Sequence, residues 1–449
     1  MASFDYDLLV IGAGSAGLSA AQTAAKCGAR VAIADPGPLG GTCVNRGCIP
    51  KKLMVYASNL AREKCLATNY GWVNPSGDFD WPTLKMAIEQ KLAQLQKSYQ
   101  SRLSKAGVSV LDCTARFLDP QTVELGERKV TVEKVIIATG AKPLKPDLPG
   151  IDCGLTSRDI FHLESLPKHL TIVGGGYIGS EFSNIFSTLG CQVNLVDRSP
   201  QILQGFDCSI RKTLQQSLID QGVRMLGGTS LEAIHKTETE TKLKLSGECN
   251  DTLIADTLLL ALGRVPNLDS LNLEAAGIKV ESKAIAVDDY SRTSQANIFA
   301  IGDCTNRVPL TPVAKAEGVA AAKTLCGEKP QKVSYRWIPS AVFCSPEAAT
   351  VGWSEEQAKA AGVDYEVMCD RFTPLHYALS PWATDSLIKL VIDSASRRIL
   401  GVHMVGDSVA EIIQALVPAL KKGLTVDELT ETIGIHPTSG EELFSMAGF

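Results

Sequence analysis

The chain has 449 residues, enough for about two to four domains of roughly 100–200 residues each. Apolar residues make up 45% and charged residues 21%, which allows a buried core and excludes a largely disordered protein. The formal net charge of -5 gives no basic surface for nucleic acid or anionic lipid, so we expect neither as a partner.

The longest uncharged apolar stretch, residues 8–25, raises the question of a membrane segment. It contains three glycines and follows Asp5 and Asp7, whereas a secretory signal needs a basic start. We therefore expect a cytoplasmic protein. The sequence is also compatible with a mature organelle protein that has lost its transit peptide.

A strand, a glycine turn, a helix and a second strand follow one another twice along the chain. In each copy an acidic residue, Asp35 or Asp197, follows the last glycine by 18 positions. The repeat predicts two folds of the same kind. The first copy comprises residues 7–11, 15–26 and 29–34, and the second comprises residues 169–173, 180–189 and 191–196.

Other predicted elements follow in chain order. Strands are expected at residues 134–138, 257–262 and 297–301, and a long helix at 84–106. A linker is expected at residues 142–149 and a boundary near 330–339. Beyond it, strands at 348–352, 386–392 and 399–404 and helices at 408–422 and 426–432 predict an α+β domain of about 110 residues.

Both glycine turns have the spacing of a dinucleotide site, Gly12-x-Gly14-x-x-Gly17 and Gly174-x-Gly176-x-x-Gly179. Such glycines allow a tight turn and a close approach of backbone N–H groups to a pyrophosphate at the helix start, and the acid binds a ribose hydroxyl. A glycine turn also occurs for packing alone, but here strand, helix and acid are all in place. Two sites suggest a bound flavin and a diffusing nicotinamide nucleotide.

The 13 cysteines are an odd number in a long chain, unlike the disulfide framework of a small secreted domain, and we expect most of them to be buried, unpaired thiols. Cys43 and Cys48 differ, because they lie five apart in the string GGTCVNRGCIPKK, just after the first glycine turn. At a helix start this spacing would let the sulfurs meet across one turn and cycle between dithiol and disulfide, and the helix dipole would lower a thiol pKa. Two buried thiols are the alternative; a zinc site would need two more nearby ligands, which the sequence does not offer, and we predict no metal.

His436 is a candidate acid–base group, since it could take a proton from a dithiol and protonate a leaving thiolate. Glu441, five residues on, could hold the imidazole in one tautomer. A single histidine near a C-terminus is more often ordinary. Here a redox pair needs an acid–base group and the chain has only six histidines.

With these motifs the chain resembles, end to end, the flavin disulfide reductases of the glutathione reductase and dihydrolipoamide dehydrogenase family. The resemblance implies an α/β fold with two Rossmann-like dinucleotide-binding domains and a C-terminal α+β dimerisation domain. It also implies a homodimer in which His436 and Glu441 serve the other subunit's thiols. The implied domains are FAD-binding (1–142), NAD(P)H-binding (143–266), central (267–335, completing the FAD site) and interface (336–449).

The resemblance further implies an electron path from nicotinamide to flavin, to the Cys43–Cys48 disulfide and then to a substrate disulfide. Cys43 matches the interchange thiol and Cys48 the flavin-facing thiol. Lys51 matches the lysine near the flavin, with Glu181 as its ion-pair partner. The implied cofactor contacts are Gly12, Gly14, Ser15, Gly17, Asp35, Gly41, Thr42, Lys52, Thr139, Gly140, Asp303, Thr311, Gly174, Gly176, Tyr177, Gly179, Asp197, Arg198 and Arg264.

Tyr177 matches an aromatic gate over the flavin, and simple helix packing is its alternative role. Residues 46–52 and the residues after His436 are similar to the glutathione reductase branch. Ser15 and Tyr99 match substrate contacts there. Two arginines that anchor substrate carboxylates in that branch are replaced by Gln22 and Val319, and a neutral group is a poor substitute for a bidentate arginine.

Arg102 or Lys315 could compensate for the two missing arginines.

The residues that select the coenzyme point in different directions. Asp197 favours the free ribose of NADH, whereas Arg198 matches a phosphate-binding arginine of NADPH enzymes and Gln204 replaces a second one. We expect weakened selectivity for NADPH.

The sequence therefore predicts an FAD-dependent disulfide oxidoreductase that uses NADPH or NADH. Glutathione disulfide is the typical substrate of this branch and the one that Gln22 and Val319 call into question. One alternative is a reductase of another disulfide, such as a modified glutathione, a dihydrolipoyl group or a small protein. The other is a flavoprotein without turnover that senses redox state or binds a partner.

Overall fold

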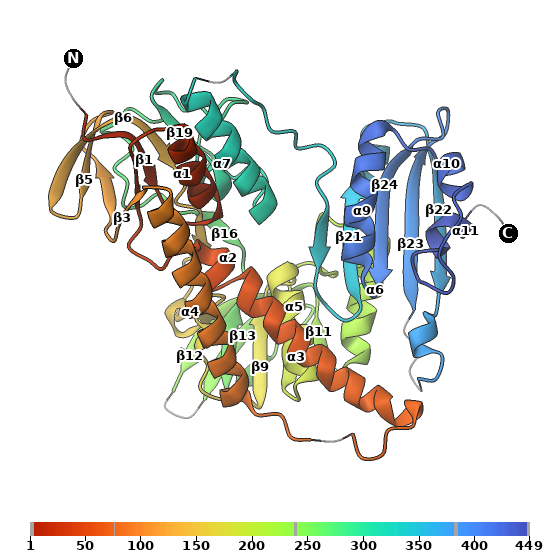
Figure 1. Ribbon diagram of the computed structural model, residues 1–449. Coiled ribbons are helices and arrows are strands. Elements are labelled where there is room, and N and C mark those ends of the chain that lie inside the picture. The colour runs from red at the N-terminus through yellow and green to blue at the C-terminus, as the bar shows by residue number, and fades with distance from the viewer. Residues whose placement is uncertain (1–3, 76, 238–239, 328, 381–384, 447–449) are drawn as a thin grey trace. The chain divides into compact units, whose positions relative to one another are not determined.

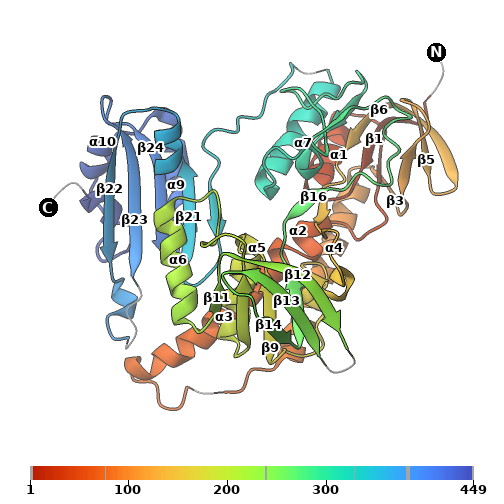
Figure 2. The ribbon, with the colours of Figure 1, turned by 180° about the vertical axis from the view of Figure 1, so that it is seen from behind.

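The structure is a computed structural model that describes residues 4–75, 77–237, 240–327, 329–380 and 385–446. Figure 1 and Figure 2 follow the chain by colour. The chain divides into two compact units. Unit 1 comprises Met1–Leu53, Thr83–Leu144 and Gly263–Tyr335, and unit 2 comprises Met54–Pro82, Lys145–Leu262 and Arg336–Phe449.

Unit 1 is built on a seven-stranded sheet in the order β3-β2-β1-β6-β5-β4, with β19 also paired to β6. The first part of β6 pairs antiparallel with β5, and its later part pairs parallel with β1 and β19. The strands are β1 (Tyr6–Ile11), β2 (Val31–Ala34), β3 (Ser109–Leu111), β4 (Ala115–Phe117), β5 (Thr122–Leu125), β6 (Arg128–Ile137) and β19 (Ile298–Ala300).

Helix α1 (Ser15–Lys26) packs closely on α7 (Thr311–Leu325), and both views show the two side by side (Figures 1 and 2). The approach requires small residues, since a Cβ on Gly318 would lie 2.4 Å from the Ala16 carbonyl oxygen. This packing fixes the start of α1, where the first glycine turn ends. The remaining elements of unit 1 include α2 (Gly41–Asn45), the start of α3 (Cys48–Ala67), most of α4 (Trp81–Lys105), β7 (Ala141–Pro143), β16 (Arg264–Pro266), β17 (Val280–Glu281), β18 (Ala284–Ile285) and the short helix η4 (Gly302–Thr305).

Unit 2 contains the second copy of the repeat as a parallel sheet in the order β11-β10-β9-β15-β8. The strands β12, β13 and β14, which come between β11 and β15 in the chain, form a separate antiparallel sheet. The elements are β8 (Leu155–Thr156), β9 (His169–Val173), α5 (Tyr177–Thr188), β10 (Gln192–Val196), α6 (Cys208–Asp220), β11 (Arg224–Leu226), β12 (Thr229–Lys236), β13 (Thr241–Gly247), β14 (Thr252–Ala255) and β15 (Thr257–Leu260).

The C-terminal part of unit 2 is an antiparallel sheet in the order β20-β21-β24-β23-β22. Helix α9 covers one face (Figure 1) and α6 contacts the other (Figure 2), so residues 386–392 of β23 are buried throughout. The elements are β20 (Ser340–Val342), β21 (Glu347–Gly352), α8 (Glu355–Ala360), β22 (Tyr365–Phe372), β23 (Ser386–Asp393), β24 (Ile399–Gly406), α9 (Val409–Lys422), α10 (Val426–Thr430) and α11 (Glu442–Ser445).

The predicted α/β class and the order of its elements are confirmed, with four corrections. The second helix begins at Tyr177 rather than at residue 180, because helical geometry resumes directly after Gly176. Residues 142–149 are not wholly a linker, since β7 pairs with β16. Cys43 and Cys48 lie on two helices, as described below. The expectation that most of the other cysteines are buried is also wrong, since only Cys191, Cys304 and Cys344 of those eleven are buried.

Within the described ranges, no helix is both long enough and apolar enough to cross a bilayer. In the same residues, no three His, Cys, Asp or Glu side chains gather in a way that could hold a metal ion.

Candidate active site

The first glycine turn joins β1 to α1. Gly12 has φ +108°, and a Cβ there would lie 2.3 Å from the Ala138 carbonyl oxygen. A Cβ on Gly17 would lie 1.9 Å from the Gly12 carbonyl oxygen. In contrast, a Cβ on Gly14 would meet only Gly41, at 3.9 Å. Packing within the protein therefore explains the first and third glycines but not the middle one.

The second turn, between β9 and α5, repeats this geometry. A Cβ on Gly174 (φ +113°) would lie 2.3 Å from the Ala261 carbonyl oxygen, and one on Gly179 would lie 1.8 Å from the Gly174 oxygen. A Cβ on Gly176 would meet nothing within 4 Å. The space beside the middle glycine is where a pyrophosphate approaches a helix N-terminus, so both turns fit a dinucleotide.

The two acidic residues of the repeat are held alike. Asp35 accepts hydrogen bonds from the amides of Ala13 (2.6 Å) and Gly37 (2.8 Å). Asp197 accepts them from the amides of Gly175 (2.5 Å) and Ser199 (2.7 Å). Each carboxylate thus links the end of the second strand of its repeat to the glycine turn. In dinucleotide-binding folds, an acidic residue at this position binds a ribose.

Three further features of unit 1 fit an FAD. The Thr139 hydroxyl oxygen is buried and has no hydrogen-bond partner within the described residues, so it is available to a bound group. Gly41 faces Gly14, and a Cβ there would lie 2.6 Å from the Gly14 Cα, which leaves a backbone-lined cradle. Burial raises the pKa of Asp303, and the Arg264 guanidinium, 3.9 Å from that carboxylate, opposes the shift.

Glu317 was not identified from the sequence. It is buried on α7 and accepts a hydrogen bond from the Gly302 amide at 2.6 Å, directly beside Asp303. Its other oxygen accepts one from the Tyr335 hydroxyl (2.6 Å) and lies 3.2 Å from Arg307. It therefore positions the turn that carries Asp303. A charged residue inside an alanine-rich helix was the available signal.

Cys43 lies in α2, whereas Cys48 is the first residue of α3. The expectation of one continuous helix is wrong, because Arg46 leaves helical geometry and Gly47 passes close to Thr42. A Cβ on Gly47 would lie 2.8 Å from the Thr42 carbonyl oxygen. The break places Cys48, rather than Cys43, at the start of the long helix.

The two thiols share a hydrogen bond, and the Thr311 hydroxyl lies 3.7 Å from the Cys48 sulfur. The bond from Cys43 lowers the pKa of Cys48 to about 6; Thr311 and the charge of Lys51 act in the same direction and burial opposes them. The same bond, together with burial, raises the pKa of Cys43. At neutral pH the pair therefore carries its negative charge on Cys48 and its proton on Cys43.

His436 lies in unit 2 between α10 and α11. Its Nδ1 is 3.0 Å and 3.2 Å from the two carboxylate oxygens of Glu441, which also accepts a hydrogen bond from the Thr438 amide at 3.0 Å. The His436 side chain is 83% exposed. The carboxylate fixes the ring and holds a proton on Nδ1, which leaves Nε2 free to exchange a proton with a group outside this chain segment.

Tyr177 and Glu181 lie on the first turns of α5. Tyr177 is the first residue of the helix and is 48% exposed. Glu181 is buried, and one of its oxygens accepts a hydrogen bond from the Phe343 amide at 2.8 Å. Lys51 belongs to unit 1. Its ion pair with Glu181 stays a prediction.

The residues named for substrate binding lie in unit 1 on three helices. Ser15 and Tyr99, which match substrate contacts, lie on α1 and α4, and Gln22 and Val319, which replace the two arginines, lie on α1 and α7. The Arg102 guanidinium stacks over the Tyr99 ring, 5.6 Å from its centre. The positive charge of Lys315 acts on Cys43, where it opposes the rise in pKa. Of the two cations considered as compensating groups, Lys315 is the one whose charge acts on Cys43.

Comparison with known proteins agrees with this geometry. Residues 6–318 match the pyridine nucleotide-disulphide oxidoreductase family, and residues 338–447 match its dimerisation domain, which assigns self-association to the C-terminal part. The chain is 44% identical to a glutathione reductase of Nostoc over 99% of this chain and 100% of the relative. It is 39% identical to a glutathione reductase of Burkholderia cepacia (99% of each) and 38% identical to the chloroplastic/mitochondrial glutathione reductase of Pisum sativum (99% and 82%). The chain therefore belongs to the pyridine nucleotide-disulphide oxidoreductase family and is an FAD- and NAD(P)H-dependent disulfide oxidoreductase of the glutathione reductase type.

Proposed function

We propose that the chain reduces a small disulfide through Cys43 and Cys48. The observation that carries this proposal is that Cys43 of α2 and Cys48, the first residue of α3, share a hydrogen bond in the unit that holds the first glycine turn. When bound, FAD supplies two-electron transfer between a nicotinamide nucleotide and this pair. The glycine turns with Asp35 and Asp197 hold the two nucleotides, and Thr139, Asp303 and the other cofactor contacts expected from the sequence complete the sites.

Each thiol has a separate task in the proposed reaction. In the proposed homodimer, His436 of the partner subunit takes the proton of Cys43, and the resulting thiolate attacks one sulfur of the substrate, so that a mixed disulfide forms and the S–S bond of the substrate breaks. The other half of the substrate leaves as a thiolate and takes a proton from His436, whose ring Glu441 orients. The Cys48 thiolate then attacks the Cys43 sulfur, which releases the second half as a thiolate and restores the internal disulfide, and the released thiolate takes up a proton from solvent.

We assign residues 1–142 to FAD binding, 143–266 to NAD(P)H binding, 267–335 to the central domain and 336–449 to the interface. A homodimer is supported by exposed apolar side chains in unit 2, which a second copy would cover. They are Tyr56, Leu60, Leu375, Leu379, Ile433 and Ile435. An odd number of cysteines scattered through a long chain, unlike the disulfide framework of a small secreted domain, suits a reducing compartment such as the cytoplasm.

Glutathione disulfide is the first substrate to test, because the full-length relatives are glutathione reductases. Gln22 and Val319 favour a second candidate: a different disulfide with fewer carboxylates, which does not need the missing arginines. Asp197 and Arg198 support use of both NADH and NADPH.

The decisive experiment is an anaerobic titration of the flavin-loaded protein with NADPH and, separately, with NADH, followed by visible absorbance. We expect both coenzymes to reduce the flavin at comparable rates, and a large preference for NADPH would contradict that part. Glutathione disulfide is then added. Renewed consumption of coenzyme after this addition supports glutathione reductase activity, whereas consumption that resumes only when another disulfide is added supports the second candidate. Failure of both coenzymes to reduce the flavin would overturn the proposal.

A further inference from the structure

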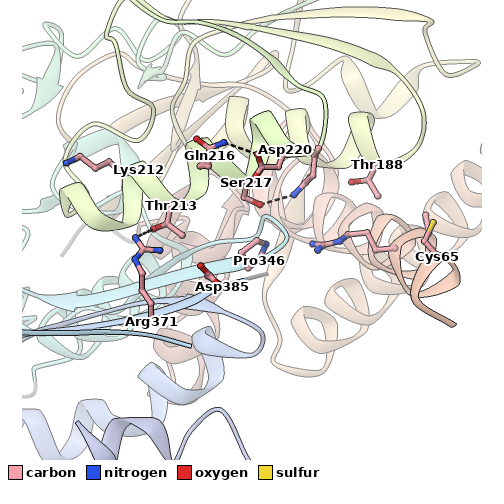
Figure 3. Close-up of a pocket in the computed structure, with 13 residues that line it drawn as sticks. Cys65, Thr188, Lys212, Thr213, Gln216, Ser217, Asp220, Pro346, Arg371 and Asp385 are labelled. Carbon is pink, nitrogen blue, oxygen red and sulfur yellow. Dashed lines mark hydrogen bonds between the residues drawn. The ribbon is translucent and has the colours of Figure 1, made fainter. Parts of the chain in front are cut away.

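Unit 2 contains a cavity of about 720 Å³ that the proposed reaction does not use. Its wall is formed by the second half of α3, by α6, by the end of α5 and by residues in or next to β21, β22 and β23 (Figure 3). Cavities of about 300–1,000 Å³ are the size that holds small organic ligands. The relay thiols and the glycine turns are not among its lining residues.

The charges around the cavity favour an organic anion. Three cations line it, Arg62, Lys212 and Arg371, against two acids, Asp220 and Asp385. Asp220 already accepts a hydrogen bond from Gln216 at 2.8 Å. The Arg371 guanidinium is oriented by a hydrogen bond to Thr213 at 2.9 Å (Figure 3), and a guanidinium has further N–H groups for a carboxylate.

Two polar atoms of the lining residues are buried without a hydrogen-bond partner in the described part of the chain. They are the Thr188 hydroxyl oxygen and the side-chain oxygen of Gln221. The nitrogen of Gln221 already donates to Ser217 and to the Ser345 carbonyl, so its orientation is fixed and its oxygen is free to accept. A ligand with amide N–H groups would satisfy such an acceptor.

The cavity also contains one thiol. Cys65 on α3 is exposed and unpaired, and Figure 3 shows it at the end of the row of side chains away from Arg371. Three other cysteines outside the relay are exposed, Cys27, Cys153 and Cys369, and they do not line the cavity. They provide internal controls for the reactivity of an ordinary surface thiol.

We propose that this cavity is a second site for a small anionic peptide disulfide, which forms a mixed disulfide with Cys65. Cations on the wall bind the carboxylates, and Gln221 accepts from a peptide N–H. The Cys65 thiolate attacks one sulfur, the S–S bond of the small disulfide breaks, and the released thiolate takes up the proton that Cys65 lost. Cys65 is oxidised and half of the small disulfide is reduced. The proposal rests on the proposed function only in that the same class of disulfide is present.

The test incubates the flavin-loaded protein with glutathione disulfide without coenzyme and measures, by peptide mass spectrometry, how fast each cysteine gains one glutathionyl group. We expect Cys65 to react about tenfold faster than Cys27, Cys153 and Cys369, since local positive charge concentrates an anion. Excess S-methylglutathione, which keeps the carboxylates and amides but has no disulfide, should slow Cys65 alone. Equal rates at the four cysteines, or no reaction at Cys65, would overturn the proposal.

Matched variants separate the cavity from general surface charge. Arg62→Gln and Arg371→Gln should each slow the modification of Cys65, whereas Lys64→Gln should not. Lys64 is a neighbour of Cys65 in sequence, but its ammonium donates to the Gly77 carbonyl and does not line the cavity. If Lys64→Gln slowed the modification of Cys65 equally, the disulfide would not be bound by the cations of the cavity. Cys43→Ser should still be modified at Cys65, so loss of turnover and loss of this site are distinguishable.

Discussion

Cys48 begins α3 and shares a hydrogen bond with Cys43 of α2, so the two sulfurs meet across a break between helices. This arrangement gives the pair its polarity. Cys48 accepts the hydrogen bond, lies at the helix N-terminus and is close to the charge of Lys51, whereas the half-buried Cys43 donates the hydrogen bond. A single continuous helix would not place Cys48 at a free helix N-terminus.

The first prediction concerns the ionisation of Cys48 in the reduced protein. Because its pKa is lowered to about 6, thiolate absorbance in the ultraviolet should rise through that pH and be nearly complete at pH 7. Below pH 6 the thiol is protonated and turnover should fall. Cys43→Ala removes the largest cause of the shift, so the midpoint should move upward, towards the ordinary value of 9.0. A midpoint near 9 in the unmodified protein would contradict the polarity of the pair.

The second prediction separates the two halves of the reaction. Cys43→Ser should abolish disulfide turnover and leave reduction of the flavin by the coenzyme intact, because only Cys43 is proposed to attack the substrate. Rapid-mixing absorbance follows the first half, and a steady-state assay follows the second. Cys27→Ser, which changes an exposed cysteine at the end of α1, is the control and should keep both. Disulfide reduction by Cys43→Ser at the original rate would disprove the relay.

The parts of the fold that could be predicted are those encoded by local pattern. The β1-turn-α1 and β9-turn-α5 units follow from glycine spacing and apolar runs, since a tight turn with φ above +100° at Gly12 and Gly174 requires glycine whatever surrounds it. The His436–Glu441 hydrogen bond, at 3.0 Å, lies between residues five apart and was expected from spacing.

The features that could not be predicted depend on contacts distant in sequence. The helix break between Cys43 and Cys48 comes from the approach of Gly47 to Thr42, and a spacing of five is equally compatible with one helix. Lys389 is fully buried because Asp207 and Glu355, far away in the chain, lie 2.9 Å and 2.6 Å from its ammonium. The exposure of each cysteine likewise depends on tertiary packing, and the amino-acid composition carries no information about that packing.

A third prediction concerns proton transfer. His436→Ala should slow disulfide turnover by about 10²–10⁴-fold, which is the usual contribution of a positioned acid–base group. This loss of rate should be smaller than that in Cys43→Ser. Glu441→Gln keeps the size of the side chain but weakens its hydrogen bond to Nδ1 of His436. Its turnover rate should therefore lie between those of His436→Ala and the unmodified protein. Steady-state rates across pH measure both, with flavin reduction by the coenzyme as an internal control. An unchanged rate in His436→Ala would remove this residue from the reaction.

The fourth prediction uses two glycines of one turn as a matched pair. A methyl group on Gly176 meets no protein atom within 4 Å, so Gly176→Ala should fold normally, with stability changed by less than about 0.5 kcal/mol. It should raise the KM for the coenzyme by about 10–200-fold, because the methyl group occupies the space for a pyrophosphate. Gly174→Ala should instead destabilise the protein, since its Cβ would lie 2.3 Å from the Ala261 oxygen at φ +113°. Thermal unfolding and coenzyme kinetics measure the pair, and an unchanged KM in Gly176→Ala would place the nucleotide elsewhere.

The fifth prediction tests whether the missing arginines limit the use of glutathione disulfide. Gln22 is half-buried on α1 and Val319 is 36% exposed on α7, and these two helices pack together in unit 1. A hydrogen bond from a charged group contributes about 1.5–3 kcal/mol, so Gln22→Arg with Val319→Arg should lower the KM for glutathione disulfide by about tenfold or more. Val319→Gln, which adds a polar group without charge, is the control and should have little effect. Because neither residue is proposed to contact the coenzyme, flavin reduction should not change. A KM that falls equally for an uncharged disulfide would mean that the new arginines act on the thiol pair rather than on the carboxylates of the substrate.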